Sequence, residues 1–435
     1  MNFICHPSRL HGDVVIPGSK SHTIRAVMLA GVAAGDSVIE APLVSADAVS
    51  GATSIAAFGA TVRREAAVWH VTGCANAPAP RQAVVDVGNS GTSMNLLLGL
   101  ASLMRAGEVI LTGDHQIQRR PCGALAAALA QLGADIVSVN GNGCPPFRLR
   151  GGLRGGAATL EARSSQYLSS LLIACPLADH ASDLTVTGLK EQPYVHMTLD
   201  WLRFLGITVE HAPDLSRFHI PGGQRYRAFR RRIPGDFSSA SFFLCAGALP
   251  GNDVTCRNLD PADTQGDKAV ADYLRAMGAT VETGPDWIRV RGNAPLHGIE
   301  IDLDPTPDAL PVMAVMGCLA GGTTVLRNVA HARIKETDRI AVMACELRKL
   351  GATVEELPDG LVLHGGALLH GAPVDGYGDH RVVMAMALAG LTLPGGLQVT
   401  TAEAAGVTFP EFPDLMRTLG ADLVDDISRS IGRKP

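Results

Sequence analysis

The chain has 435 residues, of which 46% are hydrophobic and only 4% aromatic, and 48 are glycine. This length is too great for one ordinary hydrophobic core, so we expect about two domains of a globular α/β protein. The formal net charge of −5 gives no general attraction to nucleic acid or to anionic membranes. Neither is expected as a partner, and any anion must bind to local cationic clusters.

The cysteines and the apolar segments indicate the compartment. Nine cysteines are scattered along the chain without a Cys-x-x-Cys pair, which indicates free buried thiols in a reducing environment. Residues 1–6 do not have the pattern of a signal peptide, and the longest apolar run, near residues 309–320, is too short to span a bilayer. We therefore expect a cytoplasmic protein.

A repeat organises the chain. The repeated pattern is a large apolar residue, a glycine, a small or β-branched residue and a strand-forming pair. It first occurs at residues 58–62 and returns at residues 132–136, 205–209, 277–281, 350–354 and 419–423. Each copy predicts a helix that ends at a glycine of positive φ and is followed by a strand. A second short strand is expected after at least three copies, at residues 68–73, 287–292 and 361–365. We predict six α/β units in two domains of three.

Several apolar helices are preceded by small polar or charged residues. These starts lie at residues 17–21, 88–92, 164–166, 234–239, 308 and 378–381. Serine, aspartate and asparagine are ordinary N-caps there, but lysine and arginine oppose the helix dipole. A shared anion, bound by these cationic side chains together with backbone N–H groups, would explain cations at helix starts. The residues concerned are Lys20, Arg25, Arg339 and Arg381.

The stretch Arg333–Arg339 has five charged residues out of seven, whereas 18% of the whole chain is charged. Ile340, Met343 and Leu347 follow at three- and four-residue steps, which predicts an amphipathic helix. We expect Glu336 in the first turn of this helix, on the face of the buried stripe. The stretch is either a solvated helix entrance or a site where cations hold an anion while Glu336 moves a proton.

Common catalytic motifs do not fit. In Gly18–Ser21 a serine separates the glycine from the lysine, whereas the phosphate-binding loop of NTPases has them adjacent. Residues 88–91 differ from the nucleophile-elbow motif because one residue is missing between the serine and the second glycine. We find no dinucleotide fingerprint and no metal-ligand spacing of histidine and cysteine. The sequence predicts a site without cofactor or metal that binds more than one anion.

Together these motifs resemble the family of 5-enolpyruvylshikimate-3-phosphate synthases, over most of the chain from Pro17 to about Pro413. The resemblance rests on ten motifs in order: residues 17–25, 89–92, 119–121, 164–166, 192–194, 235–236, 307–308, 335–339, 379–381 and 409–410. It implies two globular domains, each of three βαβαββ units, with the active site in the cleft between them. In this chain the domains are expected to be residues 1–18 with 236–435, and residues 19–235.

The resemblance also implies a reaction, in which the enolpyruvyl group of phosphoenolpyruvate passes to the 5-hydroxyl of shikimate 3-phosphate. Shikimate 3-phosphate would be held by Lys20, Ser21, Arg25, Ser164, Ser165, Gln166, Tyr194, Asp308 and Lys335. Phosphoenolpyruvate would be held by Lys20, Gly91, Arg120, Gln166, Arg339 and Arg381. Asp308 would accept the hydroxyl proton, and Glu336 with Lys20 would manage the proton at C3. No cofactor or metal is implied, and a monomer is expected.

Alternatives and departures remain open. Asp308 could be only a helix N-cap after Pro307. Asn95 stands where the family usually has arginine, Val407 where many members have a phosphoenolpyruvate-binding lysine, and residues 115–116 depart from the usual approach to the Arg120 motif. The chain could instead be a related carboxyvinyl transferase acting on UDP-N-acetylglucosamine, or a non-catalytic paralogue that binds phosphorylated ligands.

Overall fold

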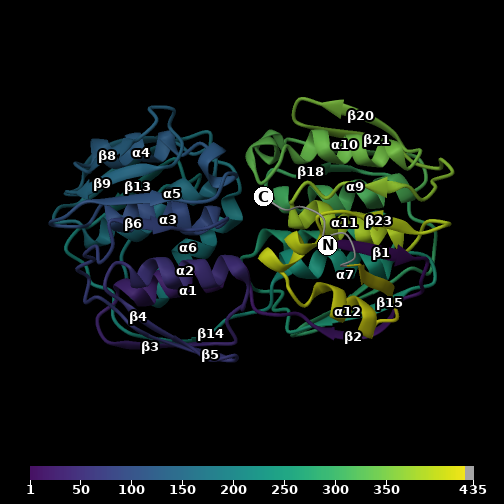
Figure 1. Ribbon diagram of the computed structural model, residues 1–435, viewed down its shortest axis with the longest axis horizontal. Helices are drawn as coiled ribbons and strands as arrows, with labels where there is room; N and C mark the ends of the chain where they lie inside the picture. The colour runs from purple at the N-terminus through teal and green to yellow at the C-terminus, as the bar shows by residue number, and fades with distance from the viewer. Residues whose placement is uncertain (427–435) are drawn as a thin grey trace, which may run out of the picture. The chain divides into compact units, whose positions relative to one another are not determined.

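The computed structural model describes residues 1–426. The chain divides into two compact units, Gly18–Ile233, here called the inserted unit, and Met1–Pro17 with Pro234–Pro435, here called the discontinuous unit. Helices and strands alternate along both units (Figure 1), so the predicted mixed α/β class is confirmed. No helix within residues 1–426 is both long and apolar enough to cross a membrane.

The described part of the inserted unit contains three four-stranded sheets, and in each one a parallel pair of strands is followed by antiparallel neighbours. The last strand of this unit pairs with its first strand, which closes the unit on itself. In spatial order the sheets are β14 (Arg230–Arg232), β3 (Asp36–Glu40), β5 (Val68–Thr72) and β4 (Thr61–Arg64); β6 (Val84–Asp86), β7 (Val109–Thr112), β9 (Phe147–Gly151) and β8 (Asp135–Ser138); β10 (Gly156–Glu161), β11 (Ser182–Thr187), β13 (Arg217–Ile220) and β12 (Glu210–His211).

Three sheets of the same strand pattern form the described part of the discontinuous unit. The N-terminal strand β1 lies between β23 and β24, so the first residues of the chain complete a sheet made from the last ones. The sheets are β22 (Pro373–Val374), β23 (Leu397–Val399), β1 (Asn2–His6) and β24 (Asp422–Asp426); β2 (His11–Val15), β15 (Asp253–Arg257), β17 (Trp287–Arg291) and β16 (Thr280–Thr283); β18 (Glu300–Asp302), β19 (Thr323–Arg327), β21 (Gly360–His364) and β20 (Thr353–Leu357).

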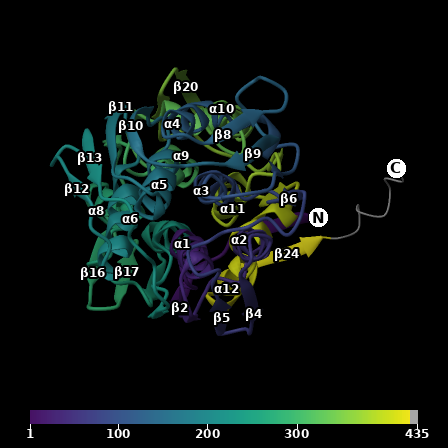
Figure 2. The ribbon, with the colours of Figure 1, turned by 90° about the vertical axis from the view of Figure 1, so that its left-hand side faces the viewer.

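Within residues 1–426, six helices are buried on nearly all sides. They are α1 (Lys20–Val32), α3 (Gly91–Ala101) and α5 (Ser165–Ala174) in the inserted unit, and α7 (Phe237–Ala248), α9 (Leu310–Leu319) and α11 (His380–Gly390) in the discontinuous unit. Most of their residues are apolar or small, as expected for helices inside a core, and polar members such as Arg25 and Ser169 are buried too. In the inserted unit α3 contacts α1 and α5, and the sheets surround these helices (Figure 2). In the discontinuous unit α7, α9 and α11 contact one another.

Six further helices bury one face and expose the other. They are α2 (Ala46–Ala56), α4 (Gly123–Gln131), α6 (Gln192–Phe204), α8 (Val270–Ala276), α10 (Arg339–Lys349) and α12 (Phe412–Thr418). After each of them comes a glycine of positive φ: Gly59, Gly133, Gly206, Gly278, Gly351 and Gly420, with φ between 72° and 109°. The predicted glycine ends are confirmed, because this backbone conformation is costly for residues with a Cβ.

The predicted strand is displaced in one copy. Residues 207–209 were expected to form it, but β12 begins only at Glu210. The amide of Gln224 accepts a hydrogen bond from the Thr208 N–H at 2.8 Å and donates one to the Thr208 carbonyl at 3.0 Å. A side chain therefore takes the place of a strand partner at this point.

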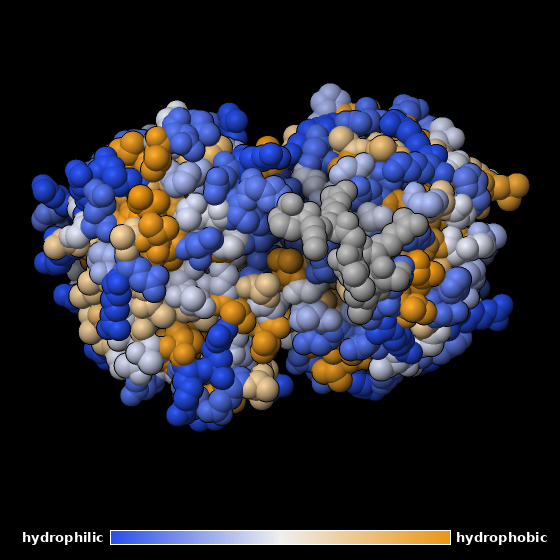
Figure 3. Space-filling view, in the orientation of Figure 1, coloured by the Kyte–Doolittle hydropathy of each residue, from blue (hydrophilic) through white to orange (hydrophobic). Residues whose placement is uncertain are grey.

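On the face seen in Figure 3, hydrophobic residues lie in small groups among hydrophilic ones.

All nine cysteines, which lie within the described residues, are free. Six are buried as predicted, but Cys74 and Cys144 are half-buried and Cys345 is exposed, so the expectation of buried thiols is wrong for these three.

Candidate active site

The charged stretch Arg333–Arg339 of the discontinuous unit runs from the end of the 3-10 turn η5 (Ala330–Ile334) to the first residue of α10. Asp338 caps α10, because its side chain accepts a hydrogen bond from the Ala341 N–H at 3.0 Å. The helix therefore begins at Arg339, and the prediction that Glu336 lies in its first turn is wrong. The apolar stripe is confirmed, since Ile340 and the positions that follow it at helical spacing are buried.

Arg339 is surrounded by carboxylates. Its side chain is 1% exposed, with Nε 2.8 Å from Asp379 Oδ2, Nη1 2.9 Å from Asp308 Oδ1 and Nη2 2.5 Å from Glu336 Oε2. Burial alone would lower the pKa of Arg339, but the three carboxylates outweigh it and raise the pKa above its ordinary value. A fully buried arginine with three carboxylates is not a solvated helix entrance.

Asp308 bridges two arginines. It lies in the 3-10 turn η4 (Pro307–Ala309), and its Oδ2 is 2.7 Å from Arg381 Nη2 while its Oδ1 binds Arg339. Helix α9 starts at Leu310 without a side-chain cap. The alternative that Asp308 is only a helix N-cap is therefore wrong.

Asp379 completes this group and was not among the predicted site residues. It is fully buried, caps α11 through the Arg381 N–H at 2.9 Å and accepts a hydrogen bond from Thr337 Oγ1 at 3.0 Å. Burial raises the pKa of Asp379, but the charge of the Arg339 guanidinium lowers this pKa by a larger amount. The pKa of Asp379 is therefore below its ordinary value. The sequence did contain one signal for such a residue. Arg339 lies in the first turn of a helix, where a cation opposes the helix dipole and needs a neighbouring carboxylate.

We call Asp308, Glu336, Arg339, Asp379 and Arg381 the carboxylate–guanidinium cluster.

The inserted unit gathers its candidate residues at the starts of three buried helices. Ser19, Ser90 and Ser164 cap α1, α3 and α5 with their side chains. The first turns of α3 and α5 are joined, because Asn95 Nδ2 donates to Gln166 Oε1 at 2.8 Å and Gln166 Nε2 donates to Thr92 Oγ1 at 3.2 Å. Asn95, at a position usually held by arginine, thus fixes the orientation of Gln166.

Arg25 ties these helices together from within. Its side chain is buried and donates to Thr198 Oγ1 at 2.9 Å, to Ser169 Oγ at 3.3 Å and to the carbonyls of Ser21 and Tyr194 at 3.1 and 3.2 Å. Burial lowers the pKa of Arg25 to about 10, although Tyr194 and Glu191 act in the opposite direction. The structure therefore places Arg25 behind Ser21 and Tyr194, with its donors directed at protein groups.

Two acidic residues near the predicted site were missed. Asp47 Oδ2 is 3.3 Å from Lys20 Nζ. Glu191, which is buried and has a φ of 56°, accepts a hydrogen bond from Ser165 Oγ at 2.7 Å. Nothing in the spacing of Asp47 or Glu191 relates them to a helix start in another part of the chain, so sequence reasoning had no signal for them.

Gly91 lies against the guanidinium group of Arg120. A Cβ atom on Gly91 would lie 2.7 Å from Arg120 Nη1, closer than real contacts allow. Arg120 follows the 3-10 turn η1 (Ile117–Arg119). The predicted pair Gly91 and Arg120 is therefore adjacent in space, although 29 residues separate the two in the sequence.

The remaining predicted residues lie close to these groups in sequence. Lys335 is half-buried and precedes Glu336, and Tyr194 lies in the first turn of α6. Val407 is half-buried at the end of the 3-10 turn η6 (Ala402–Val407), and η6 contacts α11. Asp308, Glu336, Arg339 and Arg381 are thus together in the discontinuous unit, and the candidates up to Tyr194 are in the inserted unit.

Comparison with known proteins agrees with the sequence motifs. The profile of the family described as EPSP synthase (3-phosphoshikimate 1-carboxyvinyltransferase) matches residues 4–416. A 3-phosphoshikimate 1-carboxyvinyltransferase of Ruminiclostridium cellulolyticum is 47% identical over 416 residues, covering 96% of this chain and 98% of that protein. One of Methanothrix thermoacetophila is 45% identical over 423 residues, covering 96% and 97%. The structure of EPSP synthase from Acinetobacter baumannii matches with a TM-score of 0.82 at 27% identity, covering 98% of this chain and 100% of that chain.

The fold and these relatives define a transferase. The chain belongs to the EPSP synthase family, the 3-phosphoshikimate 1-carboxyvinyltransferases. The family that the motifs predicted is confirmed.

Proposed function

We propose that this chain transfers the enolpyruvyl group of phosphoenolpyruvate to the 5-hydroxyl of shikimate 3-phosphate and releases phosphate. The reaction is a step of the shikimate pathway, which leads to the aromatic amino acids. The observation that carries the proposal is the 47% identity with a named 3-phosphoshikimate 1-carboxyvinyltransferase over nearly the full length of both chains.

The substrates would be shared between the residues predicted from the sequence. For shikimate 3-phosphate these are Lys20, Ser21, Arg25, Ser164, Ser165, Gln166, Tyr194, Asp308 and Lys335, and for phosphoenolpyruvate they are Lys20, Gly91, Arg120, Gln166, Arg339 and Arg381. Guanidinium groups bind phosphate and carboxylate through paired N–H donors, which suits two substrates that carry both anions. The position of Arg25 gives it an indirect part, in which it holds Ser21 and the start of α6 in place.

In the addition step, the 5-hydroxyl oxygen bonds to C2 of phosphoenolpyruvate. Asp308 takes the hydroxyl proton, while Glu336, with Lys20, supplies a proton to C3. In the elimination step, C3 loses a proton, the double bond forms again and the bond from C2 to the phosphate oxygen breaks. The products are the enolpyruvyl ether and inorganic phosphate, and no electron donor or acceptor is consumed.

The carboxylate–guanidinium cluster is suited to this proton transfer. Asp308 and Glu336 are paired with Arg339, and Asp308 also with Arg381, at 2.5–2.9 Å. An anionic substrate competes for the same guanidinium donors. A carboxylate that loses a cationic partner binds a proton more readily. Substrate binding would therefore convert Glu336 and Asp308 from counter-ions into proton carriers.

The proposed active site takes residues from both units, with the substrates between them. Each unit supplies cations, Lys20 and Arg120 from one and Arg339 and Arg381 from the other. We also propose a cytoplasmic monomer that acts on these two small molecules without cofactor or metal, and without nucleic acid or membrane partners. The low general affinity of a chain of net charge −5 for polyanions supports the last point.

Product analysis tests the reaction. The purified protein is incubated with phosphoenolpyruvate and shikimate 3-phosphate, and the products are followed by proton and phosphorus NMR. We expect the vinyl protons of an enolpyruvyl ether on the 5-oxygen together with free phosphate. UDP-N-acetylglucosamine in place of shikimate 3-phosphate should give neither signal. Product formation with the sugar nucleotide alone would support the related carboxyvinyl transferase instead, and no product with either acceptor would support a non-catalytic paralogue.

A further inference from the structure

We propose that a cavity of about 790 Å³ in the inserted unit binds a small organic anion that carries two or more phosphate or carboxylate groups. The cavity is lined by residues that follow the ends of α3 and α5, together with residues 76–79, 150, 152–154, 223 and 225. The proposed substrate groups lie at the opposite ends of these helices. Because α3 has 11 residues, the two ends are roughly 16 Å apart.

The lining of this cavity is strongly basic. It contains four arginines, Arg105, Arg150, Arg154 and Arg225, and one acidic residue, Asp179. Asp179 is paired with Arg105 at 3.0 Å, and Arg150 is paired with Glu108, outside the lining, at 2.7 Å. Within residues 1–426, neither Arg154 nor Arg225 makes an ion pair or a side-chain hydrogen bond. An excess of positive charge at one place in a chain of net charge −5 attracts anions locally.

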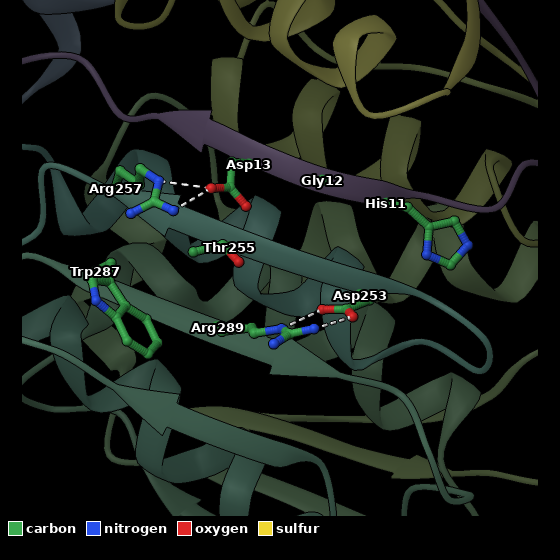
Figure 4. Close-up of a pocket in the computed structure, with 8 residues that line it drawn as sticks. All are labelled: His11, Gly12, Asp13, Asp253, Thr255, Arg257, Trp287 and Arg289. Carbon is green, nitrogen blue, oxygen red and sulfur yellow. Dashed lines mark hydrogen bonds and ion pairs between the residues drawn. The ribbon is translucent and has the colours of Figure 1, made fainter.

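A second cavity shows what a neutralised lining looks like. This cavity of about 460 Å³ lies on the sheet of β15 and β17 in the discontinuous unit (Figure 4). Each of its two arginines has its own aspartate: Arg257 Nε is 2.7 Å from Asp13 Oδ2, and Arg289 Nε is 2.8 Å from Asp253 Oδ1. Both arginines of this cavity are paired with aspartates, whereas in the cavity of the inserted unit Arg154 and Arg225 have no such partner within residues 1–426.

Arginines near the ends of helices often serve only to bind the last carbonyl groups. In this cavity, backbone N–H groups already fill that role. The N–H of Gly152 donates to the Met104 carbonyl at 3.1 Å, that of Leu153 to the Ser102 carbonyl at 2.8 Å. The guanidinium groups of Arg154 and Arg225 are therefore available for another anion.

The size and the apolar part of the lining define the ligand further. The lining also includes the buried residues Met104, Leu153, Leu177 and Ala178. A volume of about 790 Å³ is within the usual range for small-molecule sites. An anion with an apolar or aromatic body fits these features better than a bare inorganic ion.

Isothermal titration calorimetry tests the proposal with ATP as an organic polyanion and inorganic tripolyphosphate as a bare one. ATP should bind saturably, and more tightly than tripolyphosphate because its base covers apolar surface. The double variant Arg154→Glu with Arg225→Glu should bind ATP at least about tenfold more weakly, since each charge-assisted contact contributes that much. The matched control is Arg64→Glu with Arg227→Glu, two exposed arginines of the same unit outside the cavity, and its affinity should be unchanged.

Turnover of the two substrates should be normal in both double variants, which verifies that they fold. Four results would overturn the proposal. The first is that ATP does not bind saturably up to about 1 mM, and the second is that ATP and tripolyphosphate bind with equal affinity. The third is that the cavity variant and the control lose the same amount of affinity. The fourth is that saturating shikimate 3-phosphate displaces ATP. The last result would place ATP in the substrate site. None of these results bears on whether the chain has its proposed activity, which the product analysis tests separately.

Discussion

Glu336 and Asp308 are the residues on which the proposed chemistry depends. Glu336→Gln and Asp308→Asn keep the shape of each side chain but remove its ability to carry a proton. We expect each variant to lower kcat by roughly 10²-fold or more, the usual effect of losing a general acid or base. Steady-state kinetics measures this, and calorimetry should show that Glu336→Gln still binds shikimate 3-phosphate.

The control for these variants is Glu355→Gln, which changes an exposed carboxylate on β20 in the same unit and should have normal kinetics. If either cluster variant turns over at a near-normal rate, that residue takes no part in proton transfer.

The residue at position 407 leads to a prediction about the inhibitor glyphosate. The family resemblance implies that glyphosate competes with phosphoenolpyruvate for its site. A lysine at this position would help to hold both anions. A charge-assisted contact contributes about 1.5–3 kcal/mol, or about ten- to a hundredfold in affinity. We therefore expect this protein to be less sensitive to glyphosate than relatives with the lysine, and Val407→Lys to bind glyphosate and phosphoenolpyruvate more tightly. The inhibition constant and the KM are measured together, and unchanged values for both would show that position 407 does not reach the site.

Candidate site residues could be proposed from the sequence where a motif is local. Lys20, Gly91, Arg120 and the residues of 335–339 stand in short motifs, and the structure places Gly91 beside Arg120. Asp379 and Glu191 were missed because their roles depend on partners 40 and 26 residues away, Arg339 and Ser165. Such pairings follow from tertiary packing, which one sequence does not reveal.

At the scale of elements, the buried helices position the site, and their close packing is open to test. A Cβ atom on Gly99 of α3 would lie 2.5 Å from Ser170 Oγ and 2.8 Å from the Ser170 carbonyl oxygen of α5. Gly99→Ala should lower the free energy of unfolding by about 1–3 kcal/mol, because the clash outweighs the better helix propensity of alanine. Urea denaturation measures the change.

Gly321→Ala is the matched control for Gly99→Ala. The nearest atom to its added Cβ is the Leu296 carbonyl oxygen at 3.6 Å, an ordinary contact. This variant should unfold at nearly the same urea concentration as the wild type. Equal stability of Gly99→Ala and Gly321→Ala would contradict the tight α3–α5 packing.

Elements were predicted well where one local rule decides them. The glycines after the amphipathic helices are such a case, and so are the serine and aspartate caps of α1, α3, α5 and α11. One error arose where two local rules compete. Glu336 was placed inside a helix because its spacing matches the stripe, but Asp338 is the better cap and starts the helix later.

At the scale of the whole molecule, the proposed site needs both units around one set of ligands. In the proposed site one anionic substrate would contact cations of both units, and these contacts would favour a closed arrangement. Shikimate 3-phosphate should therefore reduce the radius of gyration measured by small-angle X-ray scattering. Inorganic sulfate at the same ionic strength is the control and should have a smaller effect. An unchanged profile at saturating shikimate 3-phosphate would indicate that no closure accompanies binding.

The release of phosphate tests the central claim, that this chain joins the two substrates, most directly. The purified protein is supplied with phosphoenolpyruvate alone, with shikimate 3-phosphate alone and with both, and inorganic phosphate is measured over time. The account predicts release only when both are present, in a one-to-one ratio with the enolpyruvyl ether, and a much lower rate in Glu336→Gln. Release from either substrate alone, or no release from the mixture, would contradict it.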